Sequence, residues 1–140
     1  MYKTILVPVD LAEPKASEEA LARAAALADV GDGTVRLVYV RPLTPVTYME
    51  YVPPNFEADQ QRETEEGLAA IAASVPLPSE RVSAVVRLGS VYHEVLDEAE
   101  NCGADLVVVG SHRPTMATYL LGSNATTIVR HARCSVLVVR

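Results

Sequence analysis

Glycine and polar residues suited to holding a phosphate group are concentrated between positions 110 and 124. Gly110 ends an apolar run, and Gly122 and Ser123 precede a stretch with helical character. A strand-end glycine lets a ligand approach the backbone, and the first N–H groups of a helix bind anions with help from the helix dipole. The pattern therefore predicts a phosphate-binding segment. A plain strand-to-loop glycine and a capping serine explain the same residues without a ligand.

Two side chains in this segment carry chemistry that suits a nucleotide. The guanidinium of Arg113 can clamp phosphate oxygens with two hydrogen bonds, and His112 can contact a phosphate or a ribose. Both residue types are also common in ordinary surface loops, so the residues alone leave both interpretations open.

Asp10 directly follows the first apolar run of the chain, at positions 3–9. A carboxylate there can accept a hydrogen bond from an adenine amino group, a ribose hydroxyl or a neighbouring backbone N–H. Aspartate is also common in turns and just before helices. The sequence leaves ligand binding and turn formation equally open for this residue.

Short apolar runs alternate with amphipathic stretches along the whole chain. The runs predict strands at 3–9, 35–40, 81–88, 105–109 and 136–139, and the amphipathic stretches predict helices at 14–29, 56–74, 91–101 and 123–131. Strict alternation predicts one α/β domain over residues 1–140, a doubly wound five-stranded parallel sheet with helices on both faces. Ligands of such sheets bind beyond the carboxyl ends of the strands, which here place Asp10 and Gly110 at one edge.

Composition excludes several classes of function. The 140 residues are 49% hydrophobic and carry a net charge of −6, which argues against a nucleic-acid partner or an anionic membrane surface. The sequence has no membrane-length apolar run and no signal-peptide pattern, so we expect a cytoplasmic protein without membrane insertion. Cys102 and Cys134 are predicted to be free thiols. The sequence contains no P-loop, dinucleotide-binding glycine motif or nucleophile elbow, which favours binding over catalysis.

The chain resembles the universal stress protein family over nearly its whole length. The resemblance is carried, in order, by segments 5–10, 38–40, 110–112, 120–123 and 130–139. Segments 113–114 and 119–125 look most like the short F/G-type branch, whose members include proteins associated with solute transporters. The resemblance implies an adenine-nucleotide alpha hydrolase-like fold with strand order 3-2-1-4-5.

The resemblance also implies a binding site for ATP, ADP or AMP, with Mg²⁺ or Mn²⁺ bridging the phosphate oxygens. The cofactor-binding residues it implies are Pro8, Val9, Asp10 and Val40 around the adenine and ribose, Gly110 under the ribose and first phosphates, Arg113, Gly122, Ser123 and Asn124 along the phosphate chain, and Ser111, His112 and Ser135. ATP-binding members of the family have a second glycine where this chain has Arg113. Only eight residues separate Arg113 from Gly122, where those members have nine between their glycines.

The family further suggests a homodimer formed through strand 136–139, with a tetramer as a further step, and a partner such as a membrane transporter. Two other functions remain open. One is a nucleotide-independent interaction module that uses the proline- and tyrosine-containing segment 41–55. The other is a slow ATPase or self-modifying enzyme that uses hydroxyls at Ser111, Thr115, Thr118 and Ser123. We expect a binding protein rather than an enzyme, because the sequence shows no evident general base or metal-ligand pair.

Overall fold

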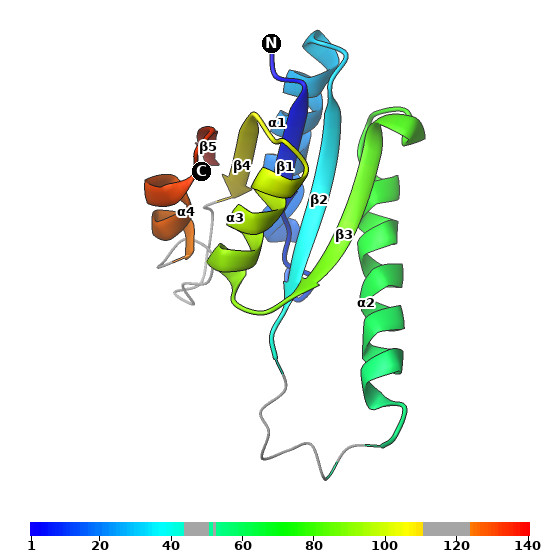
Figure 1. Cartoon of the computed structure of the whole chain (residues 1–140). Coiled ribbons are helices and arrows are strands. Elements are labelled where there is room, and N and C mark those ends of the chain that lie inside the picture. The colour runs from blue at the N-terminus through cyan, green and yellow to red at the C-terminus, as the bar shows by residue number, and fades with distance from the viewer. Residues whose placement is uncertain (44–50, 52, 111–123) are drawn as a thin grey trace.

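The structure, a computed structural model, describes residues 1–43, 51, 53–110 and 124–140 (Figure 1). These residues form five strands and four α-helices. The strands are β1 (Thr4–Pro8), β2 (Thr34–Arg41), β3 (Val82–Leu88), β4 (Leu106–Gly110) and β5 (Ser135–Val139). The helices are α1 (Lys15–Val30), α2 (Phe56–Ala73), α3 (Val91–Asn101) and α4 (Ala125–His131), and a 3₁₀ turn at Ser79–Arg81 precedes β3.

The strands form a single parallel sheet in the order β3-β2-β1-β4-β5. This confirms the predicted fold class and strand order. Strand order reverses at β1, because the chain moves outward to β2 and β3 on one side and then returns to β4 and β5 on the other. The carboxyl edge beside β1 is the switch point at which ligands of doubly wound sheets bind.

Side-chain alternation in the strands divides the hydrophobic core into two layers. Ile5 and Val7 of β1 pack with the buried alanines of α1 and with Leu68 of α2. Leu6 points to the opposite face and packs with residues of α3 and α4. Helices therefore cover both faces of the sheet, α1 and α2 on one and α3 and α4 on the other (Figure 1).

The first helix follows directly from its sequence pattern. Pro14 occupies the N-cap of α1 with φ −58°, a value that its ring already imposes. The buried face has helical spacing and consists of Leu21 and five small residues: Ser17, Ala20, Ala24, Ala25 and Ala28. Small side chains allow the helix to lie close to the sheet, and the helix ends at Gly31.

A charged network attaches α3 to the sheet. Glu98 is only 4% exposed, and its two carboxylate oxygens accept hydrogen bonds from Arg36 Nε at 2.6 Å and Arg87 Nη1 at 2.8 Å. Arg87 Nε also donates to Glu94 Oε1 at 2.8 Å. Burial of Arg87 opposes its charged form, but the hydrogen bonds to Glu94 and Glu98 outweigh this effect and raise its pKa. Paired in this way, a buried carboxylate is tolerated between helix and sheet.

In the described part of the chain, no helix has the length and apolar character needed to cross a membrane.

Replacing Glu98 with alanine is expected to lower the free energy of unfolding by about 2–4 kcal/mol. Removing one partner of a fully buried ion pair costs about 3–5 kcal/mol, and the loss here is smaller because the side chains of Arg36 and Arg87 remain 29% and 22% exposed. Glu100→Ala is the matched control, because its pair with Arg133 is exposed on both sides and such pairs contribute at most about 1 kcal/mol. Urea denaturation measures both variants, and equal destabilisation would contradict the structural role of Glu98.

Candidate functional site

A pocket of about 270 Å³ opens at the carboxyl ends of β1 and β2, on the face that α3 covers. Its lining is mostly apolar and consists of Pro8, Val9, Asp10, Val38, Tyr39, Val40, Pro42, Gly89, Val91 and Val95. We call it the switch-point pocket, because it lies beside the end of β1. It brings together four of the residues that were predicted to bind a nucleotide: Pro8, Val9, Asp10 and Val40.

The difference in length between β1 and β2 leaves backbone groups of Val40 facing the end of β1. Pairing of β1 with β2 ends at Pro8 and Val38, followed by one hydrogen bond from the Val9 N–H to the Val38 C=O. On the other side, β2 continues to pair with β3, and the Arg41 C=O accepts from the Gly89 N–H. Because backbone groups alternate in direction along a strand, those of Val40 face the β1 side, beyond the last β1–β2 pair.

Asp10 forms the turn that leaves β1. Its Oδ1 accepts a hydrogen bond from the Ala12 N–H at 3.0 Å, and its own N–H donates to Ser17 Oγ at 3.3 Å. Asp10 also lines the switch-point pocket. The turn role expected from its residue type is therefore present, and the same residue lines the pocket.

Tyr39 lies between Val38 and Val40 in β2, and its side chain packs on the opposite face of the sheet, in the layer of α1 and α2. Burial raises the pKa of its hydroxyl, and the negative charge of Asp10 raises it further, against the smaller opposing effect of Arg41. Tyr39 therefore remains a neutral hydrogen-bond donor well into the alkaline range. Arg41 itself is tied to α2 by a 2.9 Å hydrogen bond from Nη2 to Glu57.

The loop between β3 and α3 forms the other side of the pocket. Gly89 has φ +143°, a conformation that residues with a side chain rarely adopt. A Cβ at this position would also lie 3.0 Å from Oε2 of Glu94. Glycine is therefore needed here both for the turn into α3 and for the close approach of the Glu94 carboxylate.

Three predicted site residues lie at other places in the fold. Gly110 ends β4 opposite Val139, and Asn124 is the N-cap of α4 without a side-chain capping hydrogen bond. Ser135 begins β5 opposite Leu106. It therefore lies at the amino edge of the sheet, and the structure does not bring it to the switch-point pocket.

Gly110 has a clear packing role. A Cβ on this residue would lie 2.6 Å from the backbone carbonyl oxygen of Ala16, in the first turn of α1. In the structure, the group that lies close to Gly110 is therefore the backbone of α1. The remaining predicted residues, Ser111, His112, Arg113, Gly122 and Ser123, lie outside the described residues.

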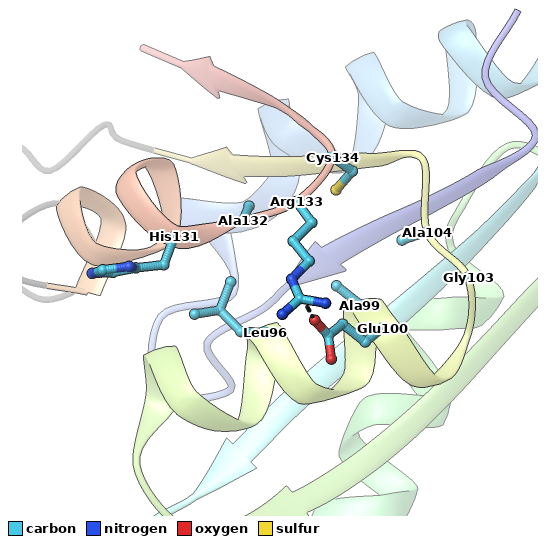
Figure 2. A pocket seen from close by; sticks show the side chains of 9 residues that line it. All are labelled: Leu96, Ala99, Glu100, Gly103, Ala104, His131, Ala132, Arg133 and Cys134. Carbon is cyan, nitrogen blue, oxygen red and sulfur yellow. Dashed lines mark ion pairs between the residues drawn. The ribbon is translucent and has the colours of Figure 1, made fainter.

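A second hollow of about 220 Å³ lies between α3 and the turn from α4 into β5 (Figure 2). Arg133 and Glu100 face each other there, with Nε and Oε1 3.2 Å apart, and the side chains are 86% and 55% exposed. Cys134 borders the hollow as a free thiol whose pKa is raised by burial. The charged groups of this hollow already pair with each other, so we assign it no ligand.

Comparison with known proteins places the chain in a family. The model of the universal stress protein family matches residues 1–140. The chain belongs to the universal stress protein family. It is 41% identical to universal stress protein G of Escherichia coli O157:H7, with 100% of both chains covered. It is 38% identical to universal stress protein A homolog 1 of Coxiella burnetii, covering 99% of this chain and 96% of the relative.

Solved structures of universal stress proteins share the fold. A family member from Burkholderia pseudomallei is 28% identical, with a TM-score of 0.69 and 99% and 96% of the two chains covered. A universal stress protein in complex with cAMP is 24% identical, with a TM-score of 0.61 and 99% and 97% covered. The Archaeoglobus fulgidus protein in complex with dAMP is 20% identical, with a TM-score of 0.67 and 99% and 98% covered.

Sequence reasoning missed the part of the pocket that β3 and α3 contribute. Gly89 directly follows the predicted strand 81–88, and Val91 and Val95 lie in the predicted helix 91–101, but neither pattern identifies them as lining residues. The apolar face of a helix gives no sign of whether it covers the core or a pocket. The available signal was the Gly-Ser step at 89–90, which places the start of α3 at the carboxyl edge.

Substitution of Gly110 by alanine is expected to destabilise the fold by about 1–3 kcal/mol, the usual cost of forcing an extra methyl group into a packed site. The cause is the contact with the Ala16 carbonyl oxygen. Gly67→Ala is the matched control, because Gly67 lies inside α2 and its added Cβ would meet only Leu11, at 3.7 Å. Alanine is favoured over glycine in a helix by about 1 kcal/mol, so thermal unfolding should shift in opposite directions for the two variants.

Proposed function

We propose that the protein binds an adenine nucleotide in the switch-point pocket and acts as a nucleotide-dependent regulatory protein. The observation that carries the proposal is the position of the Val40 backbone groups, which face the pocket side beyond the last β1–β2 pair. A backbone N–H and C=O next to each other complement the edge of adenine, which offers a ring nitrogen as acceptor and an amino group as donor.

The rest of the pocket supports a purine nucleoside. Val40 and Val95, which pack on the α3 face of the sheet, provide apolar contact for a base. Asp10 lies at the edge of the pocket, where its carboxylate can accept from a ribose hydroxyl. Solved proteins of this fold bound to cAMP and dAMP agree with such a ligand. The ligand is ATP, ADP or AMP, and ATP would carry Mg²⁺ or Mn²⁺ on its phosphate oxygens.

Calorimetric titration with ATP, ADP, AMP and GMP tests the proposal. Val91→Trp should weaken adenine nucleotide binding more than ten-fold, because the ring would fill the pocket. Tyr92→Trp is the matched control: its neighbouring site on α3 is 41% exposed and does not line the pocket. Absence of wild-type binding at millimolar nucleotide, or equal affinities of the two tryptophan variants, would refute the site.

A second comparison addresses the phosphate segment. Arg113→Ala should weaken binding of ATP more than that of AMP if the guanidinium holds the outer phosphates. Gly122→Val should act in the same direction. Equal loss for both nucleotides would assign these residues to the fold rather than to the phosphates.

The proposed regulatory form is a homodimer that pairs through β5, with a partner such as a membrane transporter. β5 pairs only with β4 in the described sheet. It is an apolar edge strand with Leu137 36% exposed, and Val129 of α4 is 51% exposed. Such an edge promotes aggregation unless another chain covers it.

Leu137→Asp is expected to convert a dimer into a monomer, because it places a charge in the middle of the paired strand. Val30→Asp is the control, since Val30 is 66% exposed at the end of α1. Light scattering after size-exclusion chromatography gives the mass of each. A monomeric wild-type protein would refute the dimer without affecting the nucleotide site.

A further inference from the structure

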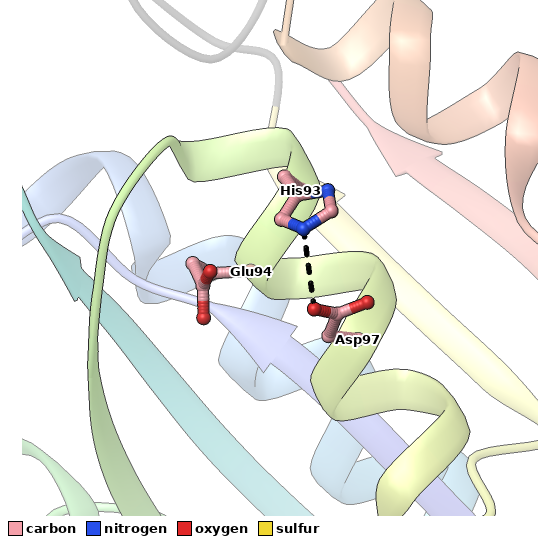
Figure 3. Close-up of side chains that lie close together, drawn as sticks. All are labelled: His93, Glu94 and Asp97. Atoms are coloured by element: carbon pink, nitrogen blue, oxygen red, sulfur yellow. Dashed lines mark ion pairs between the residues drawn. The ribbon is translucent and has the colours of Figure 1, made fainter.

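Three potential metal ligands meet on the first turns of α3, outside the switch-point pocket. The ligand atoms of His93, Glu94 and Asp97 all lie within 4.8 Å of one another. Figure 3 shows the imidazole and the Asp97 carboxylate facing each other along the helix, with Glu94 beside them. None of these three residues lines the pocket, although Glu94 approaches Gly89 at its rim.

We propose that His93, Glu94 and Asp97 form a binding site for a divalent transition metal ion of the Zn²⁺ type. His93 Nε2 and Asp97 Oδ2 are 3.4 Å apart. Zinc bonds to nitrogen and oxygen of about 2.0–2.1 Å, arranged tetrahedrally, place two ligand atoms about 3.4 Å apart. The two side chains are four residues apart on one helix face, and they already have the separation that a shared ion requires.

The charge balance around the cluster also favours a cation. Glu94, Asp97 and Glu98 contribute three carboxylates to this network, whereas Arg36 and Arg87 contribute two guanidinium groups. Glu98 and Glu94 make close hydrogen bonds to arginine, but Asp97 reaches Arg87 only at 4.0 Å. One negative charge of the network is therefore poorly compensated, and it lies on the carboxylate that faces the imidazole.

The positions of the side chains allow the site to be filled from solvent. The side chains of His93 and Asp97 are 63% and 45% exposed, whereas Glu94 is 17% exposed. Water can complete the coordination shell on the outer side. Glu94 keeps its hydrogen bond to Arg87 through Oε1 and has a second oxygen to offer the ion.

The donor set determines which ions fit. An imidazole nitrogen with two carboxylates suits Zn²⁺, Co²⁺ or Ni²⁺. Mg²⁺ and Ca²⁺ prefer sites made of oxygen alone. The site is therefore distinct in chemistry from any Mg²⁺ or Mn²⁺ carried by the phosphates of a nucleotide, and it does not depend on the proposed nucleotide function.

Titration of the full-length, nucleotide-free protein with Zn²⁺, followed by calorimetry, tests the proposal. Wild-type protein should bind one ion, and His93→Ala and Asp97→Ala should each weaken binding at least about ten-fold, since even loss of a group that only orients a ligand typically costs 10–100-fold. His131→Ala, which removes a histidine from the end of α4, is the control and should retain wild-type affinity. Thermal unfolding of the metal-free variants checks that each is folded.

Co²⁺ absorption supplies an independent readout. Visible bands without strong near-ultraviolet charge transfer are expected for nitrogen and oxygen ligands. Charge-transfer bands would instead identify Cys102 or Cys134 as the ligand and overturn the proposal. Wild-type affinity in both the His93 and Asp97 variants, or no Zn²⁺ binding by the wild-type protein at millimolar concentration, would also overturn it.

Discussion

The unequal lengths of β1 and β2 are the constraint on which the candidate site depends. A parallel strand inside a sheet normally has both sets of backbone groups paired. Here β2 pairs with β3 as far as Arg41, whereas β1 leaves the sheet after Pro8 and turns at Asp10. Among the residues that the structure describes, the last residues of this interior strand therefore have no paired strand on the β1 side. Unpaired backbone groups in an apolar hollow are costly, and a ligand with a complementary edge removes that cost.

The charged network under α3 maintains the other wall of this hollow. Arg87 pairs in register with Val40 on the neighbouring strand, and its guanidinium holds Glu94 and Glu98 of α3. Arg36 holds Glu98 from further along β2. The two arginines, at different positions on the sheet, thus fix both the rotation of α3 about its axis and its distance from the sheet. Val91 and Val95 are presented to the pocket because Glu94 and Glu98 are anchored on the adjoining side of the same helix.

Strong periodicity made most of the fold predictable from the sequence. The buried runs of β1 and β4 and the small-residue face of α1 are continuous patterns, and the structure places these elements within a few residues of the predicted limits. The family resemblance implied the part of the candidate site that comes from β1 and Val40, and the structure places these residues together because the carboxyl ends of parallel strands share one edge. Ser135 shows that membership of a sequence motif does not place a residue in the site. It belongs to a segment that resembles the family, but it begins β5 at the amino edge of the sheet, opposite the edge where the pocket lies.

Interactions between distant segments could not be derived from local pattern. Glu98 looks like an exposed helix residue, and only the arginines on β2 and β3 make its burial possible. His93 and Asp97 lie four residues apart in the predicted helix 91–101, but that spacing alone does not show that their side chains meet.

The sequence allowed Gly110 to be a ligand-binding glycine or a plain strand-to-loop glycine, and the lack of space for a Cβ beside the Ala16 carbonyl oxygen becomes visible only when α1 is placed on β4. The carboxylate of Glu94 connects the two candidate sites. Glu94 lies next to Gly89 at the rim of the pocket and accepts a hydrogen bond from Arg87 of the sheet, and its carboxylate lies within 4.8 Å of the ligand atoms of His93 and Asp97. One carboxylate therefore lies between the pocket wall, the sheet and the proposed metal site.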